Sequence, residues 1–177
     1  MRVNTQNTKK ILKEVEKDFD IHIPFLKKDY RNFSENFSRM DSFSKDDYQH
    51  YLQSYIYDND IFAKIVQNCC KDNARFFSKY FPEFKDNLFL NDFGEVAVGF
   101  VSDYVNTQVD LNEMVSDIYR SVEYLFFKEI AFLLIYRNYD RLKADNIIDE
   151  NIDEIESACW DCFSIDDVYN ACEQYIN

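Results

Sequence analysis

The chain has very little glycine or proline, with only two residues of each among 177. A sheet of many strands needs tight turns between the strands, and these two residues make most such turns. The hydrophobic fraction is 46%, which provides enough apolar surface for a folded core. The composition therefore favours a folded chain made of helices.

Histidine is equally scarce, and its scarcity limits the chemistry that the chain can perform. The two histidines are His22 and His50, and neither belongs to a Glu-x-x-His motif of the kind that holds di-iron centres. The chain also lacks a G-x-S-x-G motif and a glycine-rich phosphate loop. We therefore predict a protein that is not an enzyme, with no catalytic residue and no cofactor. An enzyme would have to use carboxylates that the sequence does not single out.

Long apolar runs and targeting signals are absent as well. The longest apolar run, Ile130 to Tyr136, is far shorter than the roughly 20 residues that cross a bilayer. No secretory signal begins the sequence, and the five cysteines are an odd number without disulfide spacing. We expect reduced thiols, a cytoplasmic location and no membrane contact.

Acidic residues are abundant, and the charge is unevenly distributed. The formal net charge is -13. Residues 1–40 hold nine Lys or Arg and six Asp or Glu, a net of +3, whereas residues 140–177 hold two and eleven, a net of -9. A field of this sign repels nucleic acid and attracts basic proteins. We expect a protein partner and no direct binding of nucleic acid.

Apolar residues recur at intervals of three and four along most of the chain, which indicates amphipathic helices. We predict an all-α, single-domain bundle of about six to eight helices, spanning residues 8–177 and preceded by a frayed segment at residues 1–7. Early helices are expected to begin near Thr8, Pro24 and Ser44. The strongest periodicity runs over residues 111–137, and it predicts a long central helix.

Start and stop signals predict the later elements. A helix is expected from Ile61 to about Tyr80. An acceptor followed three residues later by a carboxylate predicts helix starts at Asp92, Asp110 and Ser164. The Asp- and Asn-rich residues 145–151 are expected to form a polar link.

Cys159 and Cys162 form a C-x-x-C motif, which can serve in redox chemistry or zinc binding. Redox function needs an activated thiol on a βαβ scaffold, and structural zinc needs four ligands. Neither context accompanies the motif, so we expect both thiols to pack in the core.

A partial calcium-loop pattern also occurs. Asp149, Asn151 and Asp153 match the first, third and fifth ligands of such a loop. However, Glu154 stands where the loop needs glycine, and Trp160 stands where it needs a bidentate glutamate. We predict no metal site.

The most acidic stretch is the candidate surface for a partner. Its carboxylates cannot all be buried, because unpaired buried charge is too costly. A merely solvated acidic face is the alternative. Tyr57 is added because it lies away from the helical stripe formed by Tyr48, Tyr51 and Tyr55. We therefore expect it to be exposed. The predicted partner-binding residues are Asp149, Glu150, Asp153, Glu154, Glu156, Asp161 and Tyr57.

In size, acidity, helical pattern and lack of a catalytic motif, the chain resembles the small acidic all-α immunity proteins of bacterial contact-dependent inhibition and polymorphic toxin systems. The resemblance implies a cytoplasmic inhibitor that occludes a cognate toxin, often a basic nuclease. Two alternatives stay open. One is a nucleic-acid mimic that inhibits a DNA-binding protein, and the other is an oligomeric structural protein or an unrecognised enzyme.

Overall fold

The structure of this protein is a computed structural model that describes residues 61–105 and 111–176. All regular elements in these two ranges are helical, so the predicted all-α class is confirmed for them. The elements are α4 (Ile61–Phe77), the short 3-10 helix η1 (Pro82–Lys85), α5 (Asn87–Val105), α6 (Leu111–Asn138), α7 (Arg141–Trp160) and α8 (Ile165–Ile176).

The part of the chain that the structure describes holds five α-helices, fewer than the six to eight predicted for the whole. Three predicted helices, those beginning near Thr8, Pro24 and Ser44, lie outside the described residues, and so does the segment 1–7. None of the helices in the described ranges is long and apolar enough to span a membrane.

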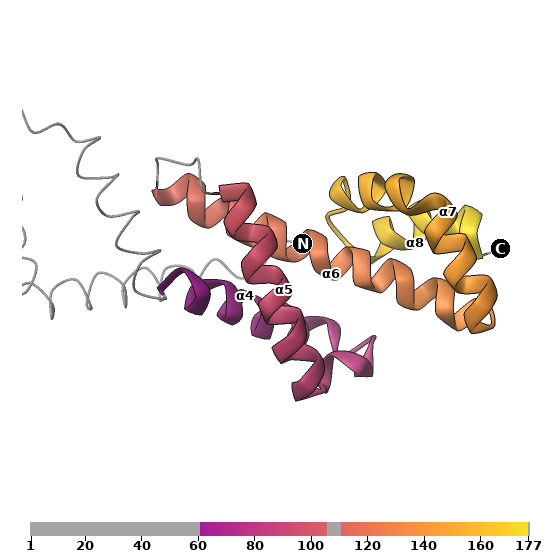
Figure 1. Cartoon of the computed structure of the whole chain (residues 1–177), viewed down its shortest axis with the longest axis horizontal. Coiled ribbons are helices and arrows are strands. Elements are labelled where there is room, and N and C mark those ends of the chain that lie inside the picture. The colour runs from indigo at the N-terminus through magenta and orange to yellow at the C-terminus, as the bar shows by residue number, and fades with distance from the viewer. Residues whose placement is uncertain (1–60, 106–110, 177) are drawn as a thin grey trace, which may run out of the picture.

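Helix α6 is the long central helix that the periodicity predicted, and it runs from Leu111 to Asn138. Its interior side chains include Ile118, Val122, Phe126 and Ile130, all almost completely buried. Figure 1 shows α4 and α5 beside the N-terminal part of α6, and α7 and α8 beside its C-terminal part. The four other helices therefore share α6 as their common core element.

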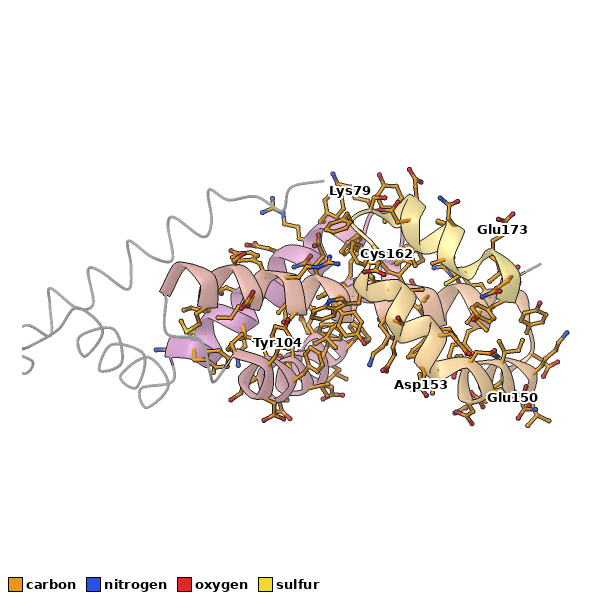
Figure 2. All side chains as sticks on the ribbon, turned by 90° about the horizontal axis from the view of Figure 1, so that it is seen from above. Lys79, Tyr104, Glu150, Asp153, Cys162 and Glu173 are labelled. Atoms are coloured by element: carbon orange, nitrogen blue, oxygen red, sulfur yellow. The ribbon has the colours of Figure 1, made fainter. Side chains whose placement is uncertain are left out.

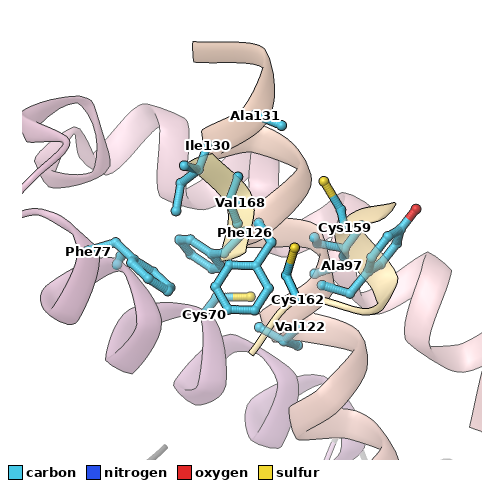
Figure 3. Close-up of a cluster of buried hydrophobic side chains, with 14 of the residues drawn as sticks. Cys70, Phe77, Ala97, Val122, Phe126, Ile130, Ala131, Cys159, Cys162 and Val168 are labelled. Atoms are coloured by element: carbon cyan, nitrogen blue, oxygen red, sulfur yellow. The ribbon is translucent and has the colours of Figure 1, made fainter. Parts of the chain in front are cut away.

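Phenylalanine rings join the helices on the α4–α5 side of the core. The ring of Phe126 on α6 stacks on Phe77 of α4 at 5.8 Å between centroids. It also meets Phe84 of η1 at 5.2 Å and Phe93 of α5 at 4.4 Å. Figure 3 shows Phe77 and Phe126 within the buried cluster, together with cysteines from α4 and from the end of α7. Many phenylalanine side chains of the described residues are thus part of the core.

Two helix boundaries differ from the sequence prediction. Helix α5 begins at Asn87 rather than near Asp92, because the side chain of Asp86 accepts the backbone N–H of Leu88 at 2.8 Å and starts the helix earlier. Asp92 lies inside α5 and is exposed. Helix α4 ends at Phe77 rather than near Tyr80, because the N–H groups of Tyr80 and Phe81 both donate to the Phe77 carbonyl in a tight turn.

The predicted polar link at residues 145–151 is wrong, because these residues lie inside α7. The helix begins at Arg141, and the Asp140 side chain accepts the Lys143 N–H at 3.1 Å. Burial of Ala144 and Ile148 against the core outweighs the weak helix propensity of the Asp and Asn residues. The helix nevertheless kinks at Asn151, which has the non-helical angles φ -127° and ψ 20°.

The predicted start of the last helix at Ser164 is confirmed. The Ser164 hydroxyl accepts the N–H of Asp167 at 3.2 Å and donates to the Asp167 carboxylate at 2.8 Å. The same carboxylate accepts the N–H of Phe163 at 3.0 Å. These bonds lower the pKa of Asp167, the Ser164 hydroxyl contributing most. Residues 161–164 are thereby fixed as a short connection between α7 and α8.

Candidate partner-binding surface

The outward side of α7 forms an acidic face, which we define by Asp149, Glu150, Asp153 and Glu154. All four carboxylates are exposed, with Asp149 and Glu150 before the kink at Asn151 and Asp153 and Glu154 after it. The buried side consists of Ala144, Ile148, Ile155 and Cys159. Figure 2 shows Glu150 and Asp153 projecting from the edge of the molecule.

None of the four carboxylates forms an ion pair within the described residues. The two nearby cations on α7 are engaged elsewhere: Arg141 lies 4.0 Å from Asp145, and the Lys143 ammonium lies 4.2 Å from the Tyr139 ring centroid. The acidic face therefore offers four unpaired charges to solvent.

The other predicted partner-binding residues have different environments. Asp161 is exposed at the C-terminal end of α7, whereas Glu156 is half-buried. The Glu156 carboxylate accepts a hydrogen bond from the Lys128 ammonium at 3.0 Å, which joins α7 to α6. Glu156 thus stabilises the packing of these two helices and is a poor part of any docking surface. Tyr57 lies outside the described residues.

The C-terminal end of α7 is held in place by Arg120, a residue that no sequence motif indicated. Its guanidinium donates to the backbone carbonyls of Trp160 and Cys162, the latter at 2.7 Å, and to Glu123 at 3.3 Å. It also lies over the Phe163 ring, 4.4 Å from the centroid. One side chain of α6 therefore satisfies the carbonyls at the C-terminal end of α7 and fixes the turn into α8.

An exposed aromatic residue lies beside this turn. Phe163 is 62% exposed, although the Arg120 guanidinium covers one side of its ring. Tyr169 on α8 is also exposed. Large aromatic side chains of this kind often form the central anchors of protein–protein interfaces. Phe163 follows Asp161 closely, so apolar and acidic groups adjoin at the end of α7.

All five cysteines of the chain are buried and free. Burial raises the pKa of Cys159 to about 12 and that of Cys162 to about 11, so both thiols are neutral at pH 7. The Cys162 thiol also donates to the Ala158 carbonyl at 3.2 Å. The C-x-x-C motif thus packs in the core, as the sequence analysis expected, and is not an activated redox pair.

The described residues contain no group of three or more His, Cys, Asp or Glu side chains placed to hold a metal ion. The partial calcium-loop pattern lies on α7, where Asp149 and Asp153 both face solvent. A calcium loop instead wraps its oxygens around one point. His22 and His50 lie outside the described residues.

Comparisons of the chain with protein-family models, with curated proteins and with solved structures gave no match. The function of this chain must therefore be inferred from its own surface.

Proposed function

We propose that this protein is a cytoplasmic binding protein that neutralises a basic toxin domain by occluding it, as an immunity protein does. The observation that carries the proposal is the acidic face of α7, whose four exposed carboxylates lack cation partners within the described residues. The surrounding residues 140–177 have a net charge of -9, which strengthens the field at this end of the molecule.

The two kinds of side chain on this surface would have separate effects on binding. The carboxylates attract a basic partner over distances of about a Debye length, roughly 8 Å at physiological salt, and so increase the association rate. Exposed Phe163 supplies apolar area that a partner pocket can bury, which slows dissociation. Arg120 fixes the position of Phe163 at the end of α7, because it binds the connection that carries this residue.

A charge-reversal experiment tests the proposal. The variant Asp149→Lys with Asp153→Lys reverses the acidic face and leaves the Glu156–Lys128 pair intact. The matched control is Asp92→Lys with Asp103→Lys, which changes the net charge equally but at exposed positions on α5. Both are compared with wild type for protection of a heterologous bacterium against the product of the adjacent gene, and for association rate with that product.

We expect the α7 variant to associate about tenfold more slowly at low salt and to protect poorly, whereas the α5 control matches wild type. Equal rates and equal salt dependence for all three proteins would contradict the proposal, and so would an adjacent gene product that is not toxic. Similar affinity for several unrelated DNA-binding proteins would instead support the nucleic-acid mimic.

A further inference from the structure

Helix α4 and the turn that follows it carry a basic stripe. We define this stripe by Lys64, Lys71 and Arg75 on the helix and Lys79 in the turn. The spacings of seven and four residues place Lys64, Lys71 and Arg75 along one side of the helix, and Lys79 follows in the turn after Phe77. All four are exposed, and none pairs with a carboxylate in the described part of the chain. The neutral side chains of Gln67 and Asn68 occupy the same side.

This stripe is a local excess of positive charge in a chain of net charge -13. Residues 61–85 hold five Lys or Arg and two Asp or Glu, a net of +3. Glu83 is already bound, since both its carboxylate oxygens accept hydrogen bonds from Arg137 at 2.9 and 3.1 Å. A basic surface of this kind needs an anionic partner or remains solvated.

The acidic face of α7 is one anionic surface in the described part of the chain. In Figure 2, Lys79 projects at one edge of the molecule while Glu150 and Asp153 project at the opposite edge. Within the described residues, no ion pair joins the two charged surfaces. Two copies of the chain could bring them together.

The basic side chains on α4 lie at helical spacing. With a rise of about 1.5 Å per residue, Lys64 and Arg75 lie about 16 Å apart along α4, and Lys71 and Arg75 lie about 6 Å apart. On α7, Asp149 and Glu150 precede the kink at Asn151, and Asp153 and Glu154 follow it.

We propose that the basic stripe of α4 binds the acidic face of α7 on a second copy of this chain. Because the two surfaces differ, the contact is heterologous, and repeated contacts produce an open chain or a ring. The net charge of -13 opposes association at long range, so the contact is weak and forms best at low salt and high protein concentration. A basic partner on α7 would compete with it.

Sedimentation velocity of the purified full chain, over a range of concentrations at low and high salt, tests this proposal. Variant A is Lys71→Glu with Arg75→Glu, which removes the basic surface and makes the net charge -17 by replacing two positive with two negative charges. Variant B is Asp153→Lys with Glu154→Lys, which removes the acidic surface and makes the net charge -9 by the opposite replacement. Circular dichroism checks that both variants keep the wild-type helix content.

We expect wild type to self-associate at least about tenfold more weakly at high salt than at low salt. Each variant alone should stay monomeric. An equimolar mixture should associate again, because the intact stripe of variant B binds the intact acidic face of variant A, and the two reversed surfaces are also opposite in charge. Net charge alone predicts something different, namely stronger association of variant B than of wild type.

The proposal is overturned if wild type remains monomeric at low salt, or if the mixture of variants stays monomeric while wild type associates. Binding of a labelled oligonucleotide by wild type but not by variant A, without self-association, would assign the stripe to nucleic acid instead. These measurements involve no toxin, so their failure leaves the proposed immunity function untouched, and failure of that function leaves them valid.

Discussion

Replacing Arg120 with alanine should cost the protein much of its stability. The Arg120 side chain is only 23% exposed, and its guanidinium makes the hydrogen bonds to Trp160, Cys162 and Glu123 described above. Hydrogen bonds to charged groups contribute about 1.5–3 kcal/mol each, and a cation–π contact adds about 0.5–1 kcal/mol. Water can reach some of the freed groups, so we expect a net loss of about 3 kcal/mol in the free energy of unfolding.

Glu123 adds to this loss. It is largely buried, and its burial raises the pKa of the carboxyl even though the Arg120 charge opposes that shift. Without Arg120, the carboxylate would be left in a poorly solvated position without its cation. Arg120→Lys keeps the charge but loses the planar fork that reaches several acceptors at once, so we expect an intermediate effect.

Urea unfolding followed by circular dichroism measures the change. With a slope of about 2 kcal/mol per molar urea, a loss of about 3 kcal/mol lowers the midpoint by about 1.5 M. The control is Arg141→Ala, since that side chain is 92% exposed and lies 4.0 Å from Asp145, and it should change stability by less than about 0.5 kcal/mol. If Arg120→Ala unfolds at the wild-type midpoint, Arg120 does not hold the α7–α8 connection.

Two substitutions test the packing of α6, and a labelling experiment tests the state of the thiols. Ser121→Ala should raise the urea midpoint, by about 1 kcal/mol in free energy, because the Ser121 hydroxyl is buried without a hydrogen-bond partner; a lower midpoint would show that the hydroxyl is satisfied. Glu129→Gln should stabilise the protein at neutral pH, because burial raises the pKa of Glu129 and its ionised form is therefore disfavoured in the folded state. Wild type regains that stability as the pH falls through the raised pKa, so unfolding curves of the two proteins should converge toward about pH 4; a constant difference would contradict the assignment. The five buried cysteines should react with a thiol reagent only after unfolding, and rapid labelling of the native protein would show that one of them is accessible.

Sequence patterns predicted the helices best where apolar spacing alone decided the structure. Helix α6 packs neighbours on several sides, and its regular apolar steps predicted its extent to within a residue. Start signals were less reliable, because an Asp or Ser followed by a carboxylate three residues later also occurs on the solvent side of a helix. Ser164 is a true cap, whereas Asp92 lies within α5.

The error in α7 has a similar cause. Asp and Asn residues favour turns locally, but Ala144 and Ile148 recur four residues apart and bury against the core. The local preference survives only as the kink at Asn151, where the side chain donates to the Ile147 carbonyl at 2.8 Å. Asp140 was a readable start signal, since its side chain accepts the N–H of the residue three positions later.

The candidate surface was partly predictable for electrostatic reasons. Exposure of Asp149, Glu150, Asp153 and Glu154 follows from the cost of burying charge, and the structure exposes all four. The pairing of Glu156 with Lys128 joins residues 28 positions apart, so only the packing of α7 on α6 could show it. Summing charge over long segments also concealed the basic stripe, because acidic residues elsewhere in the middle of the chain cancel it.

The stability of α7 and its acidic face depend on different residues. Packing of Ile148, Ile155 and Cys159, together with the bonds from Arg120 and Lys128, holds the helix against α6. The outward carboxylates form no ion pair within the described residues, so reversing the charge of two of them should leave the fold intact. A loss of binding in such a variant, with the stability of wild type, therefore reports on the surface itself. A face that is only solvated would show neither a change in stability nor a change in binding.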